Sequence, residues 1–281
     1  MKKTYLNPFL FIVFLVSLGT GLAWAANTWL FTDEAQMRQE IPKHVKNSRA
    51  LYYIIVRSRN RDLGGQTALA LRDLLQKSPN NPHLEIAYAF SLFMARDQFH
   101  RERYGQKRFP VMTEVERRAG DISYYQRKAL KALPKSPSVL LMAARSDFYT
   151  YISTSDDSIE DERKAINLVR RAIKEDPQWG DLYYWLGRML IDQNTNHRNK
   201  VDKARNAHEA IAALQKVEKL KPSWRADCLR QYISAYRDLG QIGKTLEYLD
   251  AYGKERPGFA KQPWVIQWRQ SLMKQLQEKR S

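Results

Sequence analysis

Cysteine is nearly absent from this chain of 281 residues, in which Cys228 stands alone. A single thiol cannot form an intramolecular disulfide, and it cannot build a metal site from cysteines. Its apolar neighbours Ala226, Leu229 and Tyr232 predict a buried thiol. Glycine and proline are also scarce, at 12 and 11 residues, which disfavours a β-rich or disordered chain. The abundant Leu, Ala, Lys, Arg, Glu and Gln favour helices instead.

Recognised catalytic motifs are missing as well. The sequence contains no G-x-S-x-G, P-loop or H-E-x-x-H. Its five histidines are scattered, and no pair has the spacing that places two metal ligands on one helical turn. The acidic run 156–162 lacks the glycine and the alternating ligands of a calcium loop, and is interpreted as a solvated helix start. We therefore predict no catalytic residue, no metal and no cofactor; an enzyme with an unrecognised site is a remaining alternative.

Acidic residues are outnumbered by basic ones, 30 to 47, so the formal net charge is +17. Such a charge favours contact with acidic proteins, anionic polymers or anionic lipid surfaces. The alternative is a solvated basic surface with no partner. Because the basic residues are spread along the chain and form no dense block, we expect no nucleic-acid binding.

Charged residues are missing near the N-terminus, between positions 4 and 32. Lys2 and Lys3 precede an apolar stretch at 9–18, and a small-x-small sequence follows that ends at Ala25. This order is typical of a secretory signal that is cleaved after Ala25.

The same segment also satisfies the requirements of an uncleaved anchor. Residues 9–26 reach the roughly 17–25 apolar residues that a membrane span needs. Both alternatives put the bulk of the chain outside the cytoplasm, either in the periplasm or secreted, or anchored in the cytoplasmic membrane. A lipoprotein is excluded because no cysteine follows the apolar stretch.

Proline occurs in a regular pattern, because five prolines each close a run of helical periodicity and are followed by another run. These are Pro79, Pro134, Pro177, Pro222 and Pro257. Self-similarity of this kind is typical of a solenoid, in which each repeat buries its apolar face on its neighbours.

The clearest repeat runs from Ala226 to Pro257. Its first helix carries apolar residues at i, i+3, i+4 and i+7, starting at Leu229, which marks one buried face. Gly240 then supplies the positive φ that the turn requires, and a second helix continues to Pro257.

These units resemble the tetratricopeptide repeat (TPR), a helix–turn–helix of about 34 residues. Two units carry its small, apolar, small and proline spacing: Ala165, Val169, Ala172 and Pro177, then Ala210, Leu214, Val217 and Pro222. The Leu186-Gly187 pair matches the first helix of the family, where a small residue lets two helices approach. The resemblance covers roughly residues 47–257 and implies an all-α, TPR-like solenoid of about five helix pairs.

The expected organisation has three parts. Residues 1–25 form the signal or anchor, 26–46 a linker, and 47–281 the repeat domain. A final helix from Pro263 to Glu278 would cap the last repeat, with one apolar side formed by Trp264, Trp268, Leu272 and Leu276. Because the closing prolines are 55, 43, 45 and 35 residues apart, we expect inserted loops at 99–120, 153–160 and 193–203.

The resemblance also nominates a binding groove, because in this family the first helices of successive repeats line a concave face. The repeat phase places the following residues there: Ile86, Phe90, Phe93, Leu141, Arg145, Phe148, Tyr149, Tyr184, Arg188, Ile191, Arg230 and Arg237. Arginines among aromatics suit an extended acidic peptide or a carboxylate. The resulting hypothesis is a non-catalytic protein-interaction scaffold of the cell envelope. The main alternative is a binder of anionic polysaccharide or anionic lipid.

Overall fold

The computed structural model of the chain describes residues 33–60, 63–102, 118, 120–150, 157–196 and 201–278. Within these ranges the regular structure is helical throughout, as predicted. The signal or anchor expected at 1–25 lies outside the described residues, and so does most of the insertion at 99–120. Among the helices of the described ranges, none has both the length and the apolarity that a membrane crossing requires.

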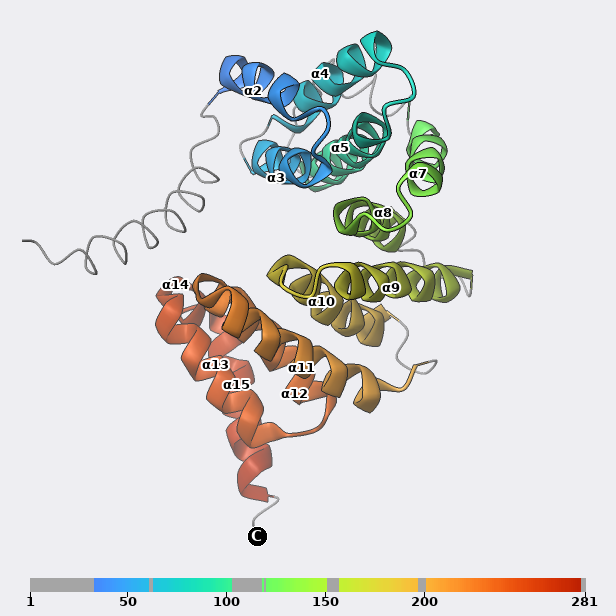
Figure 1. The fold of residues 1–281 in the computed structure, drawn as a ribbon. Helices are drawn as coiled ribbons and strands as arrows, with labels where there is room; N and C mark the ends of the chain where they lie inside the picture. The colour runs from blue at the N-terminus through green and yellow to red at the C-terminus, as the bar shows by residue number, and fades with distance from the viewer. Residues whose placement is uncertain are drawn as a thin grey trace, which may run out of the picture. The chain divides into compact units, whose positions relative to one another are not determined.

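The chain forms two compact units, which divide between Ala132 and Leu133. Unit 1 contains α2 (Glu34–Glu40), the 3₁₀ helix η1 (Ile41–His44), α3 (Ser48–Arg59), α4 (Gly64–Lys77), α5 (Pro82–Glu102) and α7 (Asp121–Ala132) (Figure 1). Unit 2 contains α8 (Pro137–Thr150), α9 (Asp157–Glu175), α10 (Gly180–Asn196), α11 (Lys203–Leu220), η3 (Pro222–Trp224), α12 (Arg225–Asp238), α13 (Ile242–Glu255), α14 (Pro257–Ala260) and α15 (Pro263–Glu278). The sequence pattern had predicted one repeat domain over 47–281 and did not indicate this division.

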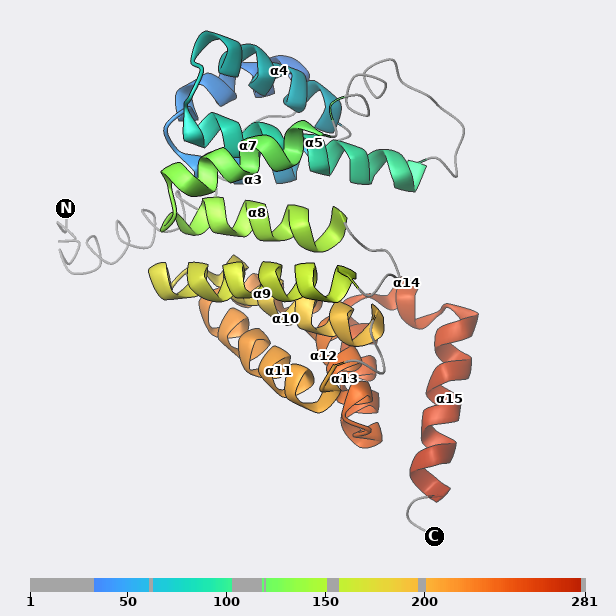
Figure 2. The same ribbon diagram turned by 90° about the vertical axis from the view of Figure 1, so that its right-hand side faces the viewer.

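The five expected helix pairs are present in the described residues. They are α3 with α4, α5 with α7, α8 with α9, α10 with α11, and α12 with α13, and the two helices of every pair contact each other. Consecutive pairs within a unit also touch, as α9 does with α10 in Figure 2. Each pair therefore buries its apolar faces both internally and on its neighbour, which is how a helical solenoid builds its core.

The prolines end the helices as the sequence indicated. Helices α4, α7, α9, α11 and α13 all terminate two residues before one of the five prolines. At Ser78, Lys221 and Arg256, which precede three of these prolines, φ lies between −133° and −144° and ψ between 65° and 74°. A residue before proline is driven out of the α region by the proline ring, so the helix stops there.

The segment 26–46, predicted as a linker, is helical over its described part. Residues 34–44 form α2 and η1, and the side chains of Met37 and Ile41 are completely buried. Asp33 begins α2 as its N-cap, where its carboxylate accepts a hydrogen bond from the backbone N–H of Gln36. Two apolar residues four apart suffice to bury one side of a short helix, although they form no extended pattern in the sequence.

The inserted loops are shorter than predicted, where they are described. Helix α10 continues to Asn196, so Gln193 and Asn194 are helical and buried rather than part of a loop. Helix α9 begins at Asp157, so the acidic run 156–162 is a helix start over its described part, as predicted, but the run is not solvated throughout. Glu162 in that run is 1% exposed, because it lies one turn before the buried Ala165 on the same face.

Helix α15 covers the end of the last repeat, with the predicted bounds. Its Val265 and Leu272 join a buried cluster formed with residues of α12 and α13: Ile233, Leu246 and Leu249. Trp268 and Leu276 pack against this cluster, as the sequence predicted. Trp264 does not pack there, since it is 54% exposed. An α-helix has 3.6 residues per turn, so residues spaced four apart drift gradually around the helix. The buried position at this end of α15 is therefore taken by Val265, which is 3% exposed.

Candidate functional site

Six of the twelve predicted groove residues are buried in the core. They are Ile86, Phe90 and Phe93 in α5, Leu141 and Phe148 in α8, and Ile191 in α10, each at most 5% exposed. Helices α5 and α8 are apolar nearly all round, and such helices are buried on most sides. In unit 1, Phe90 packs between Tyr52 and Phe93, with ring centroids 5.8 and 6.0 Å away. These six side chains therefore stabilise the repeats and are not available to a ligand.

Four of the predicted groove residues on α8 and α10 have polar side chains, and they form one cluster in unit 2: Arg145, Tyr149, Tyr184 and Arg188. Arg145 of α8 lies over the Trp185 ring of α10, with its guanidinium carbon 3.7 Å from the ring centroid. Arg145 is only 4% exposed. Stacking of this kind orients the indole through a cation–π attraction, so Arg145 links the first helices of two successive repeats.

Arg188 occupies the next turn of α10 and contacts the same aromatic rings. Its guanidinium carbon lies 5.1 Å from the Trp185 ring centroid and 5.6 Å from that of Tyr149. Its Nε is 3.5 Å from a carboxylate oxygen of Asp192. The Tyr149 hydroxyl donates a 2.8 Å hydrogen bond to Asp192, which again joins α8 to α10. The Arg188 side chain as a whole is 38% exposed, whereas Arg145 is buried.

The aromatic cluster continues toward the following repeat. Tyr184 packs edge-on against Trp185 and against Trp224 of η3, with centroids 5.6 and 5.1 Å apart. Lys221 lies over the Trp224 ring at 4.4 Å and forms an ion pair with the buried Asp181. We call the set Tyr149, Tyr184, Trp185, Arg188 and Trp224 the aromatic–arginine surface; all five are partly exposed.

Burial shifts the ionisation of the two tyrosines of this surface. Burial raises the pKa of the Tyr149 hydroxyl well above its ordinary value, and the Asp192 carboxylate raises it further. Burial likewise raises the pKa of Tyr184. Both tyrosines are therefore neutral donors across the physiological range, and Arg188 contributes the positive charge.

The two arginines predicted on the last repeat lie on α12 and are exposed. Helix α12 contacts α10, which carries Arg188. Arg237 pairs loosely with its neighbour Asp238 at 3.4 Å, whereas Arg230 has no ion-pair partner among the described residues. They extend the positive charge of unit 2 but do not join the aromatic cluster.

Sequence reasoning missed three members of the cluster: Trp185, Asp192 and Trp224. A signal for two of them was present, because Trp185, Arg188 and Asp192 follow one another at i, i+3 and i+7 on one face of α10. Trp224 follows Pro222 at the same spacing as Trp179 follows Pro177, and Trp179 is 1% exposed. The repeat pattern alone does not say which of the two tryptophans reaches the surface.

No group of three or more His, Cys, Asp or Glu side chains that could hold a metal ion occurs in the part of the chain that the structure describes. Cys228 is buried, as predicted, and burial raises the pKa of its thiol to about 12. A thiol that remains protonated is a poor nucleophile.

Comparison with known proteins identifies the fold. No protein-family model matches the sequence, and neither does any curated protein. Among solved structures, the chain is similar to TTC0263, a thermophilic TPR protein of Thermus thermophilus, with a TM-score of 0.50 and 10% identity over 80% of this chain and 98% of that one.

Two further solved structures are more distant matches. MamA gives a TM-score of 0.44 at 17% identity, over 73% of this chain and 96% of that one. YrrB, described as a TPR protein with an unusual peptide-binding site, gives 0.45 at 12% identity, over 83% and 97%. The five helix pairs, the proline-terminated second helices and the similarity to TTC0263 agree, and the chain is a TPR-like helical-repeat protein.

Proposed function

We propose that this protein is a non-catalytic interaction scaffold of the cell envelope, and that it binds an extended acidic peptide on the aromatic–arginine surface of unit 2. The observation that carries the proposal is the position of Arg188, whose side chain is partly exposed and whose guanidinium carbon lies 5.1 and 5.6 Å from the ring centroids of Trp185 and Tyr149. Arginine pairs with carboxylates through two parallel hydrogen bonds, and rigid aromatic rings give contact area at little entropic cost.

The surrounding contacts support a preorganised surface. The Arg145 guanidinium carbon lies 3.7 Å from the Trp185 ring centroid and holds that ring in place. Asp192 holds Tyr149 through a 2.8 Å hydrogen bond. A surface whose side chains are already ordered loses less conformational entropy when a peptide binds. Arg145 therefore acts as a positioning residue, and Arg188 is the contact residue.

A binding experiment tests the surface. The probe is a short fluorescein-labelled peptide of alternating glutamate and alanine, titrated by fluorescence anisotropy, with a lysine–alanine peptide of equal length for comparison. We expect the acidic peptide to bind and the Arg188→Glu variant to bind it at least about tenfold more weakly, because a repulsive charge replaces a paired one. The matched control is Arg256→Glu, at an exposed position outside the cluster. Equal affinity of the Arg188→Glu and Arg256→Glu variants for the acidic peptide would contradict the assignment of the binding surface.

The envelope location rests on the order of charges and apolar residues in the first 25 positions. A fusion of alkaline phosphatase to the C-terminus is active only outside the cytoplasm, so we expect an active fusion. An inactive fusion contradicts the location. Mass spectrometry of the mature protein then separates the alternatives, since an intact Met1 indicates an anchor and a start at Ala26 a cleaved signal.

A second candidate function follows from the net charge of +17. A general binder of anionic polymers would hold polygalacturonate or phosphatidylglycerol vesicles as well as the acidic peptide. Its affinity would fall steeply between low and physiological salt, because exposed charges are screened beyond roughly 8 Å at 0.15 M. Binding that tolerates any polyanion and is insensitive to Arg188→Glu would favour this candidate over the peptide scaffold.

A further inference from the structure

A polar hollow lies between α9, α10 and α11 of unit 2, among side chains other than those of the aromatic–arginine surface. It has a volume of about 220 Å³, and buried Ile166 and Leu190 contribute its apolar part. Because a water molecule takes up roughly 30 Å³ of liquid volume, the hollow has room for a group the size of phosphate or a small carboxylate. Its size therefore suits a small ligand better than a folded partner.

Positive charge predominates among the residues around the hollow. Arg163, Arg170 and Arg205 line it, against the single carboxylate of Asp202. That carboxylate is already used as the N-cap of α11, where it accepts a 2.9 Å hydrogen bond from the backbone N–H of Arg205. The hollow thus presents more cations than anions to a ligand.

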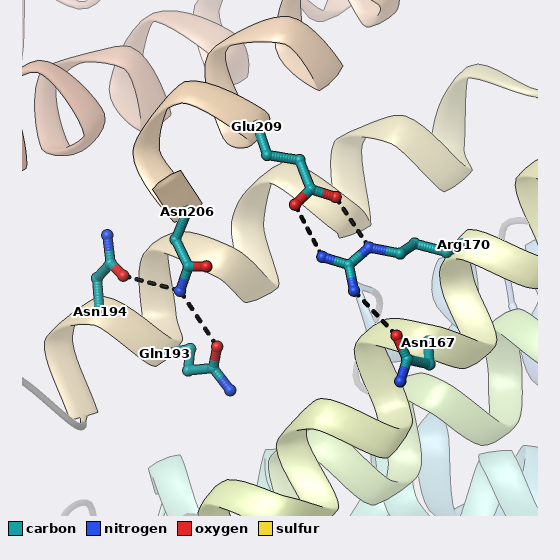
Figure 3. Close-up of polar contacts among 6 residues, drawn as sticks. All are labelled: Asn167, Arg170, Gln193, Asn194, Asn206 and Glu209. Carbon is teal, nitrogen blue, oxygen red and sulfur yellow. Dashed lines mark hydrogen bonds and ion pairs between the residues drawn. The ribbon is translucent and has the colours of Figure 1, made fainter. Parts of the chain in front are cut away.

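The three arginines are not equivalent. Arg170 is held by both oxygens of Glu209, at 2.9 and 2.8 Å, and by Asn167 at 2.9 Å (Figure 3). Arg163 has only a loose pair with Glu160 at 3.8 Å, and both side chains are more than half exposed. Arg205 has no ion pair with any described residue. The charges of Arg163 and Arg205 are therefore the ones available to an incoming anion.

A buried amide, that of Gln193, also lines the hollow. Gln193 is 4% exposed, and its carbonyl oxygen accepts a 3.2 Å hydrogen bond from Asn206, which also donates to Asn194 at 3.0 Å. The Gln193 Nε2 has no hydrogen-bond partner among the described residues. Figure 3 shows this nitrogen directed away from Asn206, on the opposite end of the amide. A buried N–H without an acceptor is costly, so an acceptor at this position would stabilise the folded protein.

We propose that this hollow binds a small oxyanion, a phosphate or a carboxylate, whose oxygen accepts a hydrogen bond from the Gln193 amide while Arg163 and Arg205 neutralise its charge. Asn194 donates to the carbonyl of Lys203 and to Asp238, both at 3.1 Å. This network fixes the amide relative to the start of α11, so the donor is preorganised. The site is independent of peptide binding on the aromatic–arginine surface.

Calorimetric titration of the full chain tests the proposal. The probes are inorganic phosphate and succinate, each compared with chloride at constant pH and ionic strength, so that the two sources of the oxyanion are distinguished. We expect saturable binding of one anion per chain for at least one probe and none for chloride. Heats that do not saturate for either probe, or that chloride reproduces, would overturn the site.

Variants locate the binding. Gln193→Glu keeps the oxygen that accepts from Asn206 but replaces the donor with a second oxygen, and Arg163→Gln/Arg205→Gln removes the free charges at exposed positions. Each is expected to weaken binding about tenfold or more, while Arg256→Gln leaves it unchanged. Circular dichroism checks folding; if Gln193→Glu unfolds, the arginine double variant decides. Full affinity in that double variant, or in a folded Gln193→Glu chain, refutes the assignment.

Discussion

Arg145 and Arg188 occupy the same point of successive repeats but have different environments. Arg145 is 4% exposed and stacks on Trp185, whereas the Arg188 side chain is 38% exposed. A buried guanidinium contributes packing along its whole stem as well as charge. The same residue type thus stabilises the fold at one repeat and faces the solvent at the next.

Substitution of these arginines should separate the two roles. We expect Arg145→Ala to lower the free energy of unfolding by about 1–3 kcal/mol, because it removes buried packing and the cation–π contact. Arg188→Ala should lower it by less, about 1 kcal/mol at most, because the side chain is 38% exposed and its ion pair with Asp192 is loose, at 3.5 Å. Urea denaturation of both variants measures this, and equal losses would contradict the distinction.

Ionisable groups near the last repeat should make the free energy of unfolding fall with rising pH in the alkaline range. Burial raises the pKa of Cys228 from 9.0 to about 12, and that of Tyr248 from 10.0 to about 12. Above pH 9 the folded chain therefore holds protons that the unfolded chain releases. The stabilisation is complete below pH 9 and is lost as the pH rises toward 12.

The thiol contribution can be isolated with Cys228→Ala. Between pH 9 and 11, the natural chain should lose up to about 1.4 kcal/mol of unfolding free energy per pH unit more than this variant does. Urea titrations at several pH values provide the comparison. Parallel pH profiles for the two proteins would show that the thiol titrates normally.

Among the helical elements, the α10–α11 pair depends on a glycine at its contact. A Cβ added at Gly187 would lie 3.2 Å from the Leu214 side chain and 3.3 Å from the carbonyl oxygen of Ala210. A Cβ at Gly243, on the exposed side of α13, would meet no atom within 4 Å. These two helical glycines form a matched pair.

Gly187→Leu should destabilise the protein by about 1–3 kcal/mol, because a larger side chain forces the two helices apart. Gly243→Leu should be neutral or slightly stabilising, since it removes the backbone entropy cost of glycine in a helix. Thermal unfolding followed by circular dichroism distinguishes them. If both variants have the melting temperature of the natural protein, the close approach of α10 and α11 at Gly187 is not required for stability.

Most elements could be predicted from the sequence because their signals are local. A proline stops a helix wherever it lies, so five helix ends were placed by Pro79 and its four counterparts. The positive φ at Gly240, observed at 67°, was predicted for the same reason. Helix α2 was missed because its burial depends on Met37 and Ile41 finding distant partners, which no local pattern records. The extent of α10 was missed because polar Gln193 and Asn194 are buried through hydrogen bonds to Asn206.

The candidate site was only partly predictable, since the repeat phase gives position in the repeat but not exposure. It placed Arg145, Tyr149 and Arg188 on adjoining helices, and their side chains do meet around Trp185. It could not separate Phe90 and Phe148, which are fully buried, from exposed aromatics. Burial depends on what the neighbouring repeat supplies, and that information lies elsewhere in the chain.

At the scale of the whole molecule, each compact unit must close its own core, and unit 2 does so with α15. The cluster of Ile233, Leu246 and Leu249 would be open to water if Val265 and Leu272 were removed. A solenoid end without a cap exposes apolar surface and becomes prone to association.

A chain that ends at Lys261 should therefore unfold at lower urea concentration and associate in solution. Light scattering and denaturation measure the two effects. The control is the full chain with Trp264→Ser, at an exposed position of the same helix. Truncation with no loss of stability would show that α15 is an independent appendage.

Photo-crosslinking in cells tests the central claim, peptide binding at the aromatic–arginine surface, most directly. A benzoylphenylalanine at Tyr184 reports on this surface, and one at Tyr124 of unit 1, which is 53% exposed, serves as the matched position elsewhere. We predict that the Tyr184 probe captures a partner through an acidic segment identified by mass spectrometry, and that Arg188→Glu abolishes the capture. Equal yields from the two positions, or a yield that survives Arg188→Glu, would contradict the account.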